Sequence, residues 1–129
     1  MNIGTHKNTL TLTAGADIAQ GACVKLDAND ASKAAICGAE DAACLGAALD
    51  DCKAGDVVAV RLFGLANETA NCIASGAIKP GATVVLDAGG KVKSGSAGVV
   101  VGIALTEAFA DGQPVEVLHR APATVAASE

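Results

Sequence analysis

The chain has almost no aromatic residues: among its 129 residues there are two Phe and neither Trp nor Tyr. Small residues are abundant instead, with 29 Ala and 15 Gly. Ligand pockets and single-stranded nucleic-acid grooves usually present aromatic side chains for contact and stacking, so the composition argues against both. An alanine-rich core buries little apolar area per side chain. We therefore expect oligomerisation or docking onto a larger surface to add stability.

Basic charge and long apolar runs are scarce as well. Lys and Arg number 9 against 14 Asp and Glu, which gives a formal net charge of -5 at pH 7. An acidic chain without a basic cluster is not expected to bind nucleic acid. No apolar run approaches the roughly 18 residues of a membrane span, and the polar start MNIGTHK lacks the apolar stretch of a signal peptide. We expect synthesis in the cytoplasm and no membrane partner.

The cysteines have no spacing typical of a metal site or a disulfide framework. They occupy positions 23, 37, 44, 52 and 72, an odd count with no C-x-x-C pair. Structural zinc sites normally use closely spaced Cys or His pairs. Free Cys is among the most buried residue types. We expect reduced thiols in the core and no bound metal.

Other candidate chemistry is poorly supported by the residue pattern. His6 or His119 could in principle activate a thiol, but His6 lies in a polar N-terminal arm and His119 ends a predicted strand. The acidic pairs at residues 40–41 and 50–51 lack the framed loop of a calcium site. We expect no enzymatic activity, no catalytic residue and no cofactor.

An internal repeat organises the chain. The segment IAQGACVKLDA at residues 18–28 reappears without a gap as IKPGATVVLDA at residues 78–88. Further on, LGAAL at 45–49 matches VGIAL at 101–105, and AGDVVAV at 54–60 matches DGQPVEV at 111–117. Such self-similarity indicates two copies of one structural unit.

The local patterns of each copy are those of strands and turns. Residues 9–13 alternate strictly, which predicts a half-buried strand with Leu10 and Leu12 inward. The sequence Lys79-Pro80-Gly81 predicts a type II turn with Gly at the position of positive φ, and Gln20-Gly21 would take the same turn. The glycine pair at 89–90 predicts a hairpin that joins residues 83–86 to residues 91–93.

One stretch is ambiguous between helix and strand. Residues 34–49 are rich in Ala and could pass for an amphipathic helix. Their counterpart at residues 98–105 is β-branched and interrupted by Gly, which favours a strand. We therefore interpret both stretches as strands.

These observations predict an all-β fold, a compact β-barrel or sandwich built from two repeated strand modules. Two half-barrels that close on each other would leave no exposed edge. We divide a single domain at residues 1–129 into a mobile N-terminal arm (1–8), a first module (9–64), a second module (65–120) and a flexible C-terminal tail (121–129).

The strand and turn residues of the second module resemble the small capsid decoration (cement) proteins of tailed phages. The similarity is carried by TVVLDAGGKVK at residues 83–93, VGIALTEA at 101–108 and GQPVEVL at 112–118, and more loosely by the first module. The resemblance implies a β-rich protein, made in the host cytoplasm, that binds the major capsid protein on the outer surface of the assembled virion. It also implies a homotrimer, with a dimer as the alternative, and no catalytic residue.

The N-terminal arm and the strand after it are the expected contact with capsid or neighbouring protomer, because an arm with unpaired backbone groups can add a strand to a sheet edge. A stand-alone β-barrel binding module for a small ligand or carbohydrate is the alternative, which a ligand-sized central cavity would favour. The expected contact residues are Asn2, Ile3, Thr5, His6, Lys7, Thr9, Leu10 and Thr11.

Overall fold

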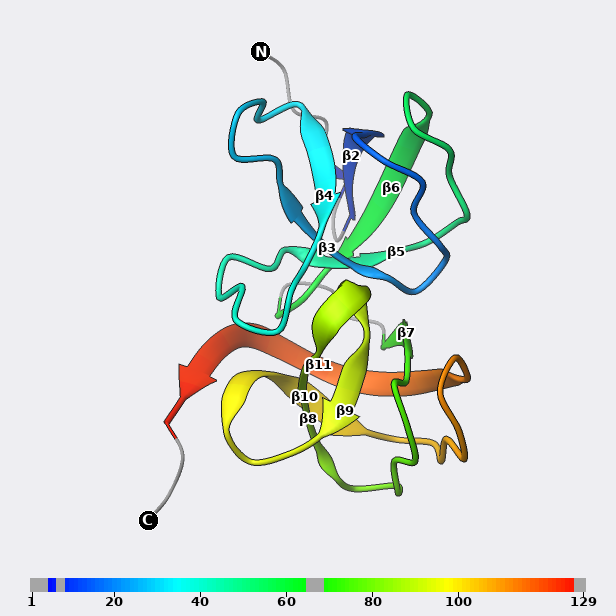
Figure 1. Cartoon of the computed structure of the whole chain (residues 1–129), viewed down its shortest axis with the longest axis vertical. Coiled ribbons are helices and arrows are strands. Elements are labelled where there is room, and N and C mark those ends of the chain that lie inside the picture. Colours follow the sequence, from blue (N-terminus) through cyan, green and yellow to red (C-terminus); the bar gives the residue numbers. More distant parts are fainter. Residues whose placement is uncertain (1–4, 7–8, 65–68, 127–129) are drawn as a thin grey trace.

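The structure, a computed structural model, describes residues 5–6, 9–64 and 69–126. Within these residues the chain folds into strands and one short 3-10 turn, without an α-helix. The strands form two separate sheets, one for each module, which are stacked along the long axis of the molecule (Figure 1). The all-β prediction is therefore confirmed.

The first module contains β1 (Thr5–His6), β2 (Thr9–Ala14), β3 (Cys23–Leu26), β4 (Lys33–Ile36), β5 (Gly46–Ala48) and β6 (Val57–Leu62). Its strand order is β1-β2-β4-β3-β5-β6, and β2 also pairs with β6. Strands β2 to β6 therefore form a closed barrel, in which β2 and β4 are parallel and the other pairs are antiparallel.

The second module contains β7 (Ala70–Ile73), β8 (Thr83–Leu86), η1 (Ala88–Gly90), β9 (Val92–Ser94), β10 (Gly98–Ala104) and β11 (Pro114–Val125). Its strand order is β7-β11-β10-β8-β9. A parallel bridge between Ala74 and Val92 connects the two ends of this curled sheet. It is the counterpart of the parallel pairing of Ala14 with Ala34 in the first barrel.

The expectation that two half-barrels close on each other is wrong, because each module closes its own sheet. The first strand of each module pairs with the last strand of the same module, β2 with β6 and β7 with β11. Pairing within a module closes a shorter loop than pairing between modules, so it has the smaller entropic cost. The repeat is therefore a repeat of one strand arrangement, which is a closed barrel in the first module and a curled sheet in the second.

The ambiguous stretch at residues 34–49 contains strands, as predicted. It begins within β4 and ends just after β5, with turns and irregular backbone between them. Ala48 points into the first core with 2% of its surface exposed, whereas Ala47 packs toward the second module. Tertiary contacts thus override the helical preference of alanine.

The predicted glycine turns are present in both modules. The φ angles are 90° at Gly21 and 85° at Gly81. In each turn the residue after the glycine donates its N–H to a carbonyl three residues back, from Ala22 to Ala19 and from Ala82 to Lys79. Positive φ at the third residue is what a type II turn requires, and glycine adopts it without a steric penalty.

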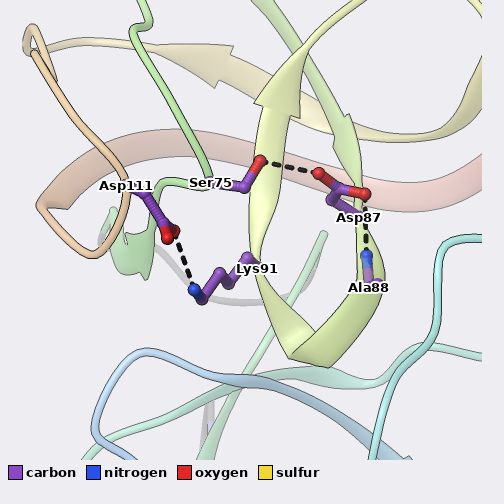
Figure 2. A network of polar contacts seen from close by, with 5 residues as sticks. All are labelled: Ser75, Asp87, Ala88, Lys91 and Asp111. Atoms are coloured by element: carbon purple, nitrogen blue, oxygen red, sulfur yellow. Dashed lines mark hydrogen bonds and ion pairs between the residues drawn. The ribbon is translucent and has the colours of Figure 1, made fainter.

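The aspartate of the repeated Leu-Asp-Ala sequence caps a turn in both modules. The Asp27 carboxylate accepts a hydrogen bond from the N–H of Asn29 at 2.8 Å. Asp87 accepts from the N–H of Ala88 at 2.8 Å and from the Ser75 hydroxyl at 2.7 Å, as Figure 2 shows. These two bonds lower the pKa of Asp87, because they stabilise the charged form.

A second contact in the same region fixes the neighbouring loop. Lys91 Nζ lies 2.7 Å from Asp111 Oδ1 and links the start of the β9 segment to the loop between β10 and β11 (Figure 2). Because Asp111 is largely exposed, this ion pair contributes little stability by itself. It orients the loop that carries Phe109.

Buried apolar side chains form two clusters. One fills the first barrel and consists mainly of Leu10, Leu12, Ile18, Val24, Val58, Val60 and Leu62. The other combines the core of the second module with first-module residues that point outward, including Cys23, Ala47 and Phe63. The two modules thus share an apolar interface.

The turn η1, which joins β8 to β9 in the second module, lies close to the first module. The N–H of Gly90 donates to the carbonyl of Cys37 at 2.8 Å. A Cβ atom at Gly90 would lie 2.9 Å from Ile36 Cγ2 and 3.0 Å from the Cys23 carbonyl oxygen. Only glycine allows the hairpin to pack this tightly.

The ends of the chain are ordered further than the sequence suggested. Strand β11 continues to Val125, past the expected start of the tail at residue 121, because residues 123–125 pair with residues 98–100 of β10. At the other end, Thr5 and His6 pair with Leu10 and Thr9. Residues 1–4 and 7–8 of the arm and residues 127–129 of the tail lie outside the described residues.

Candidate docking surfaces

Strand β2, expected to contact a partner, is already paired on both sides. It pairs with β6 along one edge, and with β1 and β4 along the other. Leu10 is only 8% exposed and belongs to the first core, whereas Thr11 is exposed. The β2 backbone is therefore largely paired within the barrel, which leaves little of it to add a strand to another sheet.

The edge strand of the first sheet is β1, which contains the expected contact residues Thr5 and His6. Among the other expected contacts, Thr9 and Thr11 alternate with the buried Leu10 along β2, so they lie on the outer face of the barrel. Asn2, Ile3 and Lys7 lie outside the described residues. The outer face of β2, rather than its backbone, is thus the part of this strand that a partner can reach.

His119, considered above as a possible base, has a packing role. Its ring lies 5.4 Å from the ring of Phe63, and its Nδ1 accepts a hydrogen bond from the N–H of Gly64 at 2.8 Å. A Cβ atom at Gly64 would lie 2.5 Å from the backbone nitrogen of Ala121, so glycine is required here. The histidine holds the end of the first module against β11.

Four of the cysteines gather in one buried group between the modules, which sequence spacing did not reveal. They are Cys23, Cys37, Cys44 and Cys72, and each is at most 6% exposed. Because the thiols of Cys23 and Cys37 donate hydrogen bonds to Cys44, the pKa of Cys44 is lowered. The same bonds raise the pKa values of the two donors, and burial raises them further.

All five cysteines are free, and the prediction that they are buried is confirmed. The described part of the chain contains no group of three or more His, Cys, Asp or Glu arranged to hold a metal ion. Cys52 lies apart from the other four and packs with the first core. The other four thiols serve as small buried side chains where the two modules meet.

The acidic doublets cap turns. Asp41 accepts a hydrogen bond from the N–H of Gly38 at 2.6 Å and pairs with Lys25 at 2.9 Å, and both contacts lower its pKa. Asp51 accepts from the N–H of Gln20 at 2.7 Å. These carboxylates support loops, as expected for residues outside a calcium-binding loop.

Two pockets among the described residues lie at the surface. A pocket of about 500 Å³ lies beside Asp17, Cys52 and Asp56, and a second of about 510 Å³ lies between Gln20 and Asn71, where the two modules meet. The interior of the first barrel is filled by the apolar cluster described above. This arrangement does not favour the alternative of a ligand held inside the barrel.

The most apolar exposed surface lies on the second module. Seven large apolar side chains in the described residues are exposed, and five of them belong to β10, β11 or the loop between these strands: Ile103, Leu105, Phe109, Leu118 and Val125. Ile103 and Leu118 are direct partners across the two strands, so their side chains lie on the same face. Contiguous exposed apolar side chains are a feature that interaction sites often share, so this face is a candidate docking surface.

The chain has no helix of the length and apolarity needed to cross a membrane within its described residues. No curated protein matches the sequence significantly.

Comparison with known proteins connects this fold to phage capsids. The head fiber gp8.5 N base of bacteriophage phi29 has a similar structure, with a TM-score of 0.70 and 21% sequence identity over 88% of this chain and 94% of that chain. At this identity the likeness concerns the fold. The family model of phage cement proteins matches residues 3–120. Since this match covers both modules, the chain belongs to the phage cement protein family and is a structural protein of a phage capsid.

Proposed function

We propose that this protein binds the outer surface of the assembled capsid and reinforces the shell, without enzymatic activity. The observation that carries this proposal is the family match over residues 3–120. A cement protein has to recognise the major capsid protein in its assembled arrangement. We infer that it is made in the host cytoplasm and joins the virion as a homotrimer.

The physical properties of the chain support this role. Its surface is acidic and its net charge is -5, which keeps an exposed protein soluble. Carboxylates such as Asp41 and Asp87 cap turns, and glycines such as Gly46 and Gly90 allow close backbone packing, which is typical of a rigid structural module. Several weak contacts on one oligomer raise the local concentration of the remaining contacts, so a trimer holds where a monomer dissociates.

We propose that the N-terminal end of the first barrel makes part of the capsid contact. This region includes the edge strand β1, and the exposed Thr11 lies beside it on β2. An edge strand presents unpaired backbone groups that can pair with a strand of another chain. The contribution of β2 is limited to its outer side chains.

Co-sedimentation with purified shells tests the proposal. The full-length protein is expected to sediment with mature shells and to bind unassembled capsid protein much more weakly. Equal binding to free subunits, or no binding to shells, would contradict the proposed function.

A truncated variant tests the role of the arm. Removal of residues 1–7 is expected to weaken attachment at least about tenfold, which corresponds to about 1.4 kcal/mol, and to leave the circular dichroism spectrum of the β-fold intact. Removal of residues 127–129 is the control for a shortened chain and should not change binding. If both truncated proteins bind shells equally well, the arm has no part in the contact.

A further inference from the structure

The four cysteines between the modules meet around one strand of the first barrel. Cys23 lies in β3, which pairs with β4 on one side and with β5 on the other. Cys37 directly follows β4, and its N–H donates to the carbonyl of Cys23 at 2.9 Å. This bond continues the pairing of β3 with β4 by one residue, so the two side chains lie on the same face of the sheet.

Cys44 reaches the same face from the other side of β3. The next residue, Leu45, donates its N–H to the carbonyl of Val24 at 2.8 Å, and β5 then pairs with β3. The Cys44 thiol accepts hydrogen bonds from Cys23 and Cys37. Of all contacts that Cys23 and Cys44 make, the one between them has the largest effect on the pKa of each thiol. These two cysteines are therefore the most strongly interacting pair of the group.

The backbone of one member of this pair is fixed, and that of the other is less restrained. Cys23 is held in the sheet between two neighbouring strands. Cys44 lies between β4 and β5 in a segment without strand pairing, where its N–H donates to the carbonyl of Asp41 at 3.1 Å in a turn. A disulfide requires a narrow range of Cα separations and of dihedral angles. A segment that is not held in a sheet can adjust to these requirements while its partner stays in place.

Cys44 is also the member of the group best suited to react with a small oxidant. The hydrogen bonds from Cys23 and Cys37 lower its pKa to about 5, so this thiol is deprotonated at neutral pH. Its side chain is 6% exposed, whereas the other three are at most 1% exposed. Ala42 and Ala43, which precede it, are exposed, so Cys44 lies just beneath the surface. The thiolate is the form of cysteine that is oxidised most readily.

We propose that Cys23 and Cys44 form a disulfide when hydrogen peroxide reaches this group. The Cys44 sulfur first attacks one oxygen of the peroxide, the O–O bond breaks, and the released hydroxide takes up a proton to become water. Cys44 is then a sulfenic acid. The Cys23 sulfur next attacks the Cys44 sulfur, the S–O bond breaks, and the proton of Cys23 leaves with the hydroxide as a second water. The two thiols thus lose two hydrogens, and one peroxide is reduced to two waters.

The disulfide encloses residues 23–44, which contain β3, β4 and the segment after β4. A cross-link of this kind stabilises a protein mainly by restricting its unfolded chain, so the oxidised protein should unfold at a higher temperature. Without an oxidant the five thiols stay free. The occasion for oxidation rests on the proposed function, because a protein on the outer surface of a virion leaves the reducing host cytoplasm at release.

Peroxide treatment of the purified, reduced full-length protein tests the proposal. The mass is expected to fall by two hydrogens, and three of the five thiols should react with an alkylating reagent after denaturation. Peptide mapping without reductant should find Cys23 joined to Cys44. The oxidised protein should melt about 5 °C or more above the reduced protein, and a reductant should reverse this shift.

Two variants show whether the reaction depends on the described group. Cys44→Ser should keep its four remaining thiols free under the same treatment, because the reactive thiol is absent. Cys52→Ser is the matched control, since Cys52 packs with the first core and apart from the other four, and it should form the disulfide as the wild-type protein does. Circular dichroism of both variants before treatment checks that the fold is retained.

Several results would overturn the proposal. They are five free thiols after treatment, oxygen added to Cys44 without a cross-link, a disulfide between any other pair, and a Cys44→Ser variant that still forms one. The capsid function is tested separately. A protein that forms the disulfide but ignores shells refutes only that function, whereas a protein that binds shells and never cross-links refutes only this inference.

Discussion

The glycine in the repeated Gly-x-Ala sequence offers the sharpest test of the fold, through substitution by alanine. A Cβ atom at Gly46 would lie 1.8 Å from the carbonyl oxygen of Arg61, and one at Gly102 would lie 2.2 Å from the carbonyl oxygen of Leu118. Arg61 and Leu118 are themselves equivalent in the repeat. Both glycines are thus needed for the same close approach between two strands.

The size of the effect follows from these distances. A Cβ atom almost never approaches another heavy atom within 3.0 Å, so Gly46→Ala requires a shift of more than 1 Å in a backbone that is fixed by sheet pairing on both sides. Overpacking in a rigid core costs about 1–3 kcal/mol and more where the backbone has to move. We expect about 3 kcal/mol or more for each alanine variant, which lowers the melting temperature of a protein of this size by about 10 °C.

Urea unfolding followed by circular dichroism measures the loss. The control is Gly76→Ala, because a Cβ atom there would meet nothing within 4 Å and the residue does not have positive φ. This control should stay within about 0.5 kcal/mol of the wild-type protein. If Gly46→Ala and Gly102→Ala unfold within about 1 kcal/mol of wild type, the strand crossing is not as close as described. If a variant is insoluble, limited proteolysis of fresh lysate against the control gives the same comparison.

Three further predictions concern the capping network, the thiols and the module interface. Asp87→Ala should destabilise the protein by about 1–2 kcal/mol in urea unfolding, since two hydrogen bonds to a carboxylate are lost. The pKa of Asp87 is lowered in the folded state from an ordinary value of 3.8, so the stability that its carboxylate contributes is complete above that pH and is lost as the pH falls through the folded pKa. Asp87→Asn should therefore lose less stability than the wild-type protein below about pH 4. If both proteins lose the same stability there, Asp87 does not have the role assigned to it. The native thiols should resist alkylation and all five should react after denaturation, whereas three labelled thiols with a mass lower by two hydrogens would reveal a disulfide. Phe63→Ala should cost about 3 kcal/mol, because Phe63 is 4% exposed between the modules, and a loss below about 1 kcal/mol would mean that this interface contributes little.

The sequence did not show which backbone edges and side chains are open to a partner. The alternation correctly predicted that Leu10 points into the core, but it did not show that the backbone of this expected contact residue is paired within the barrel. Alternation shows which residues share a face, but it does not show which neighbours already occupy the strand edges. The exposed pair Ile103 and Leu118 lies far apart in sequence, and only the register of β10 and β11 brings the two side chains together.

The sequence by itself determined the repeat, the type of its elements and their turns. Pro80-Gly81, the glycines at 89–90 and the alternation at residues 9–13 act through local backbone sterics and side-chain periodicity, so they predict structure without knowledge of distant contacts. Tertiary structure decided that each module forms a sheet of its own and that four cysteines meet between the modules. It also decided that Cys23 and Ala47 are buried at the module interface, whereas their equivalents Thr83 and Ile103 are exposed. The physical reason is that these features depend on how the modules pack against each other. Equivalent residues of the two modules therefore differ in burial, because only one of the two equivalent surfaces lies at the interface between the modules.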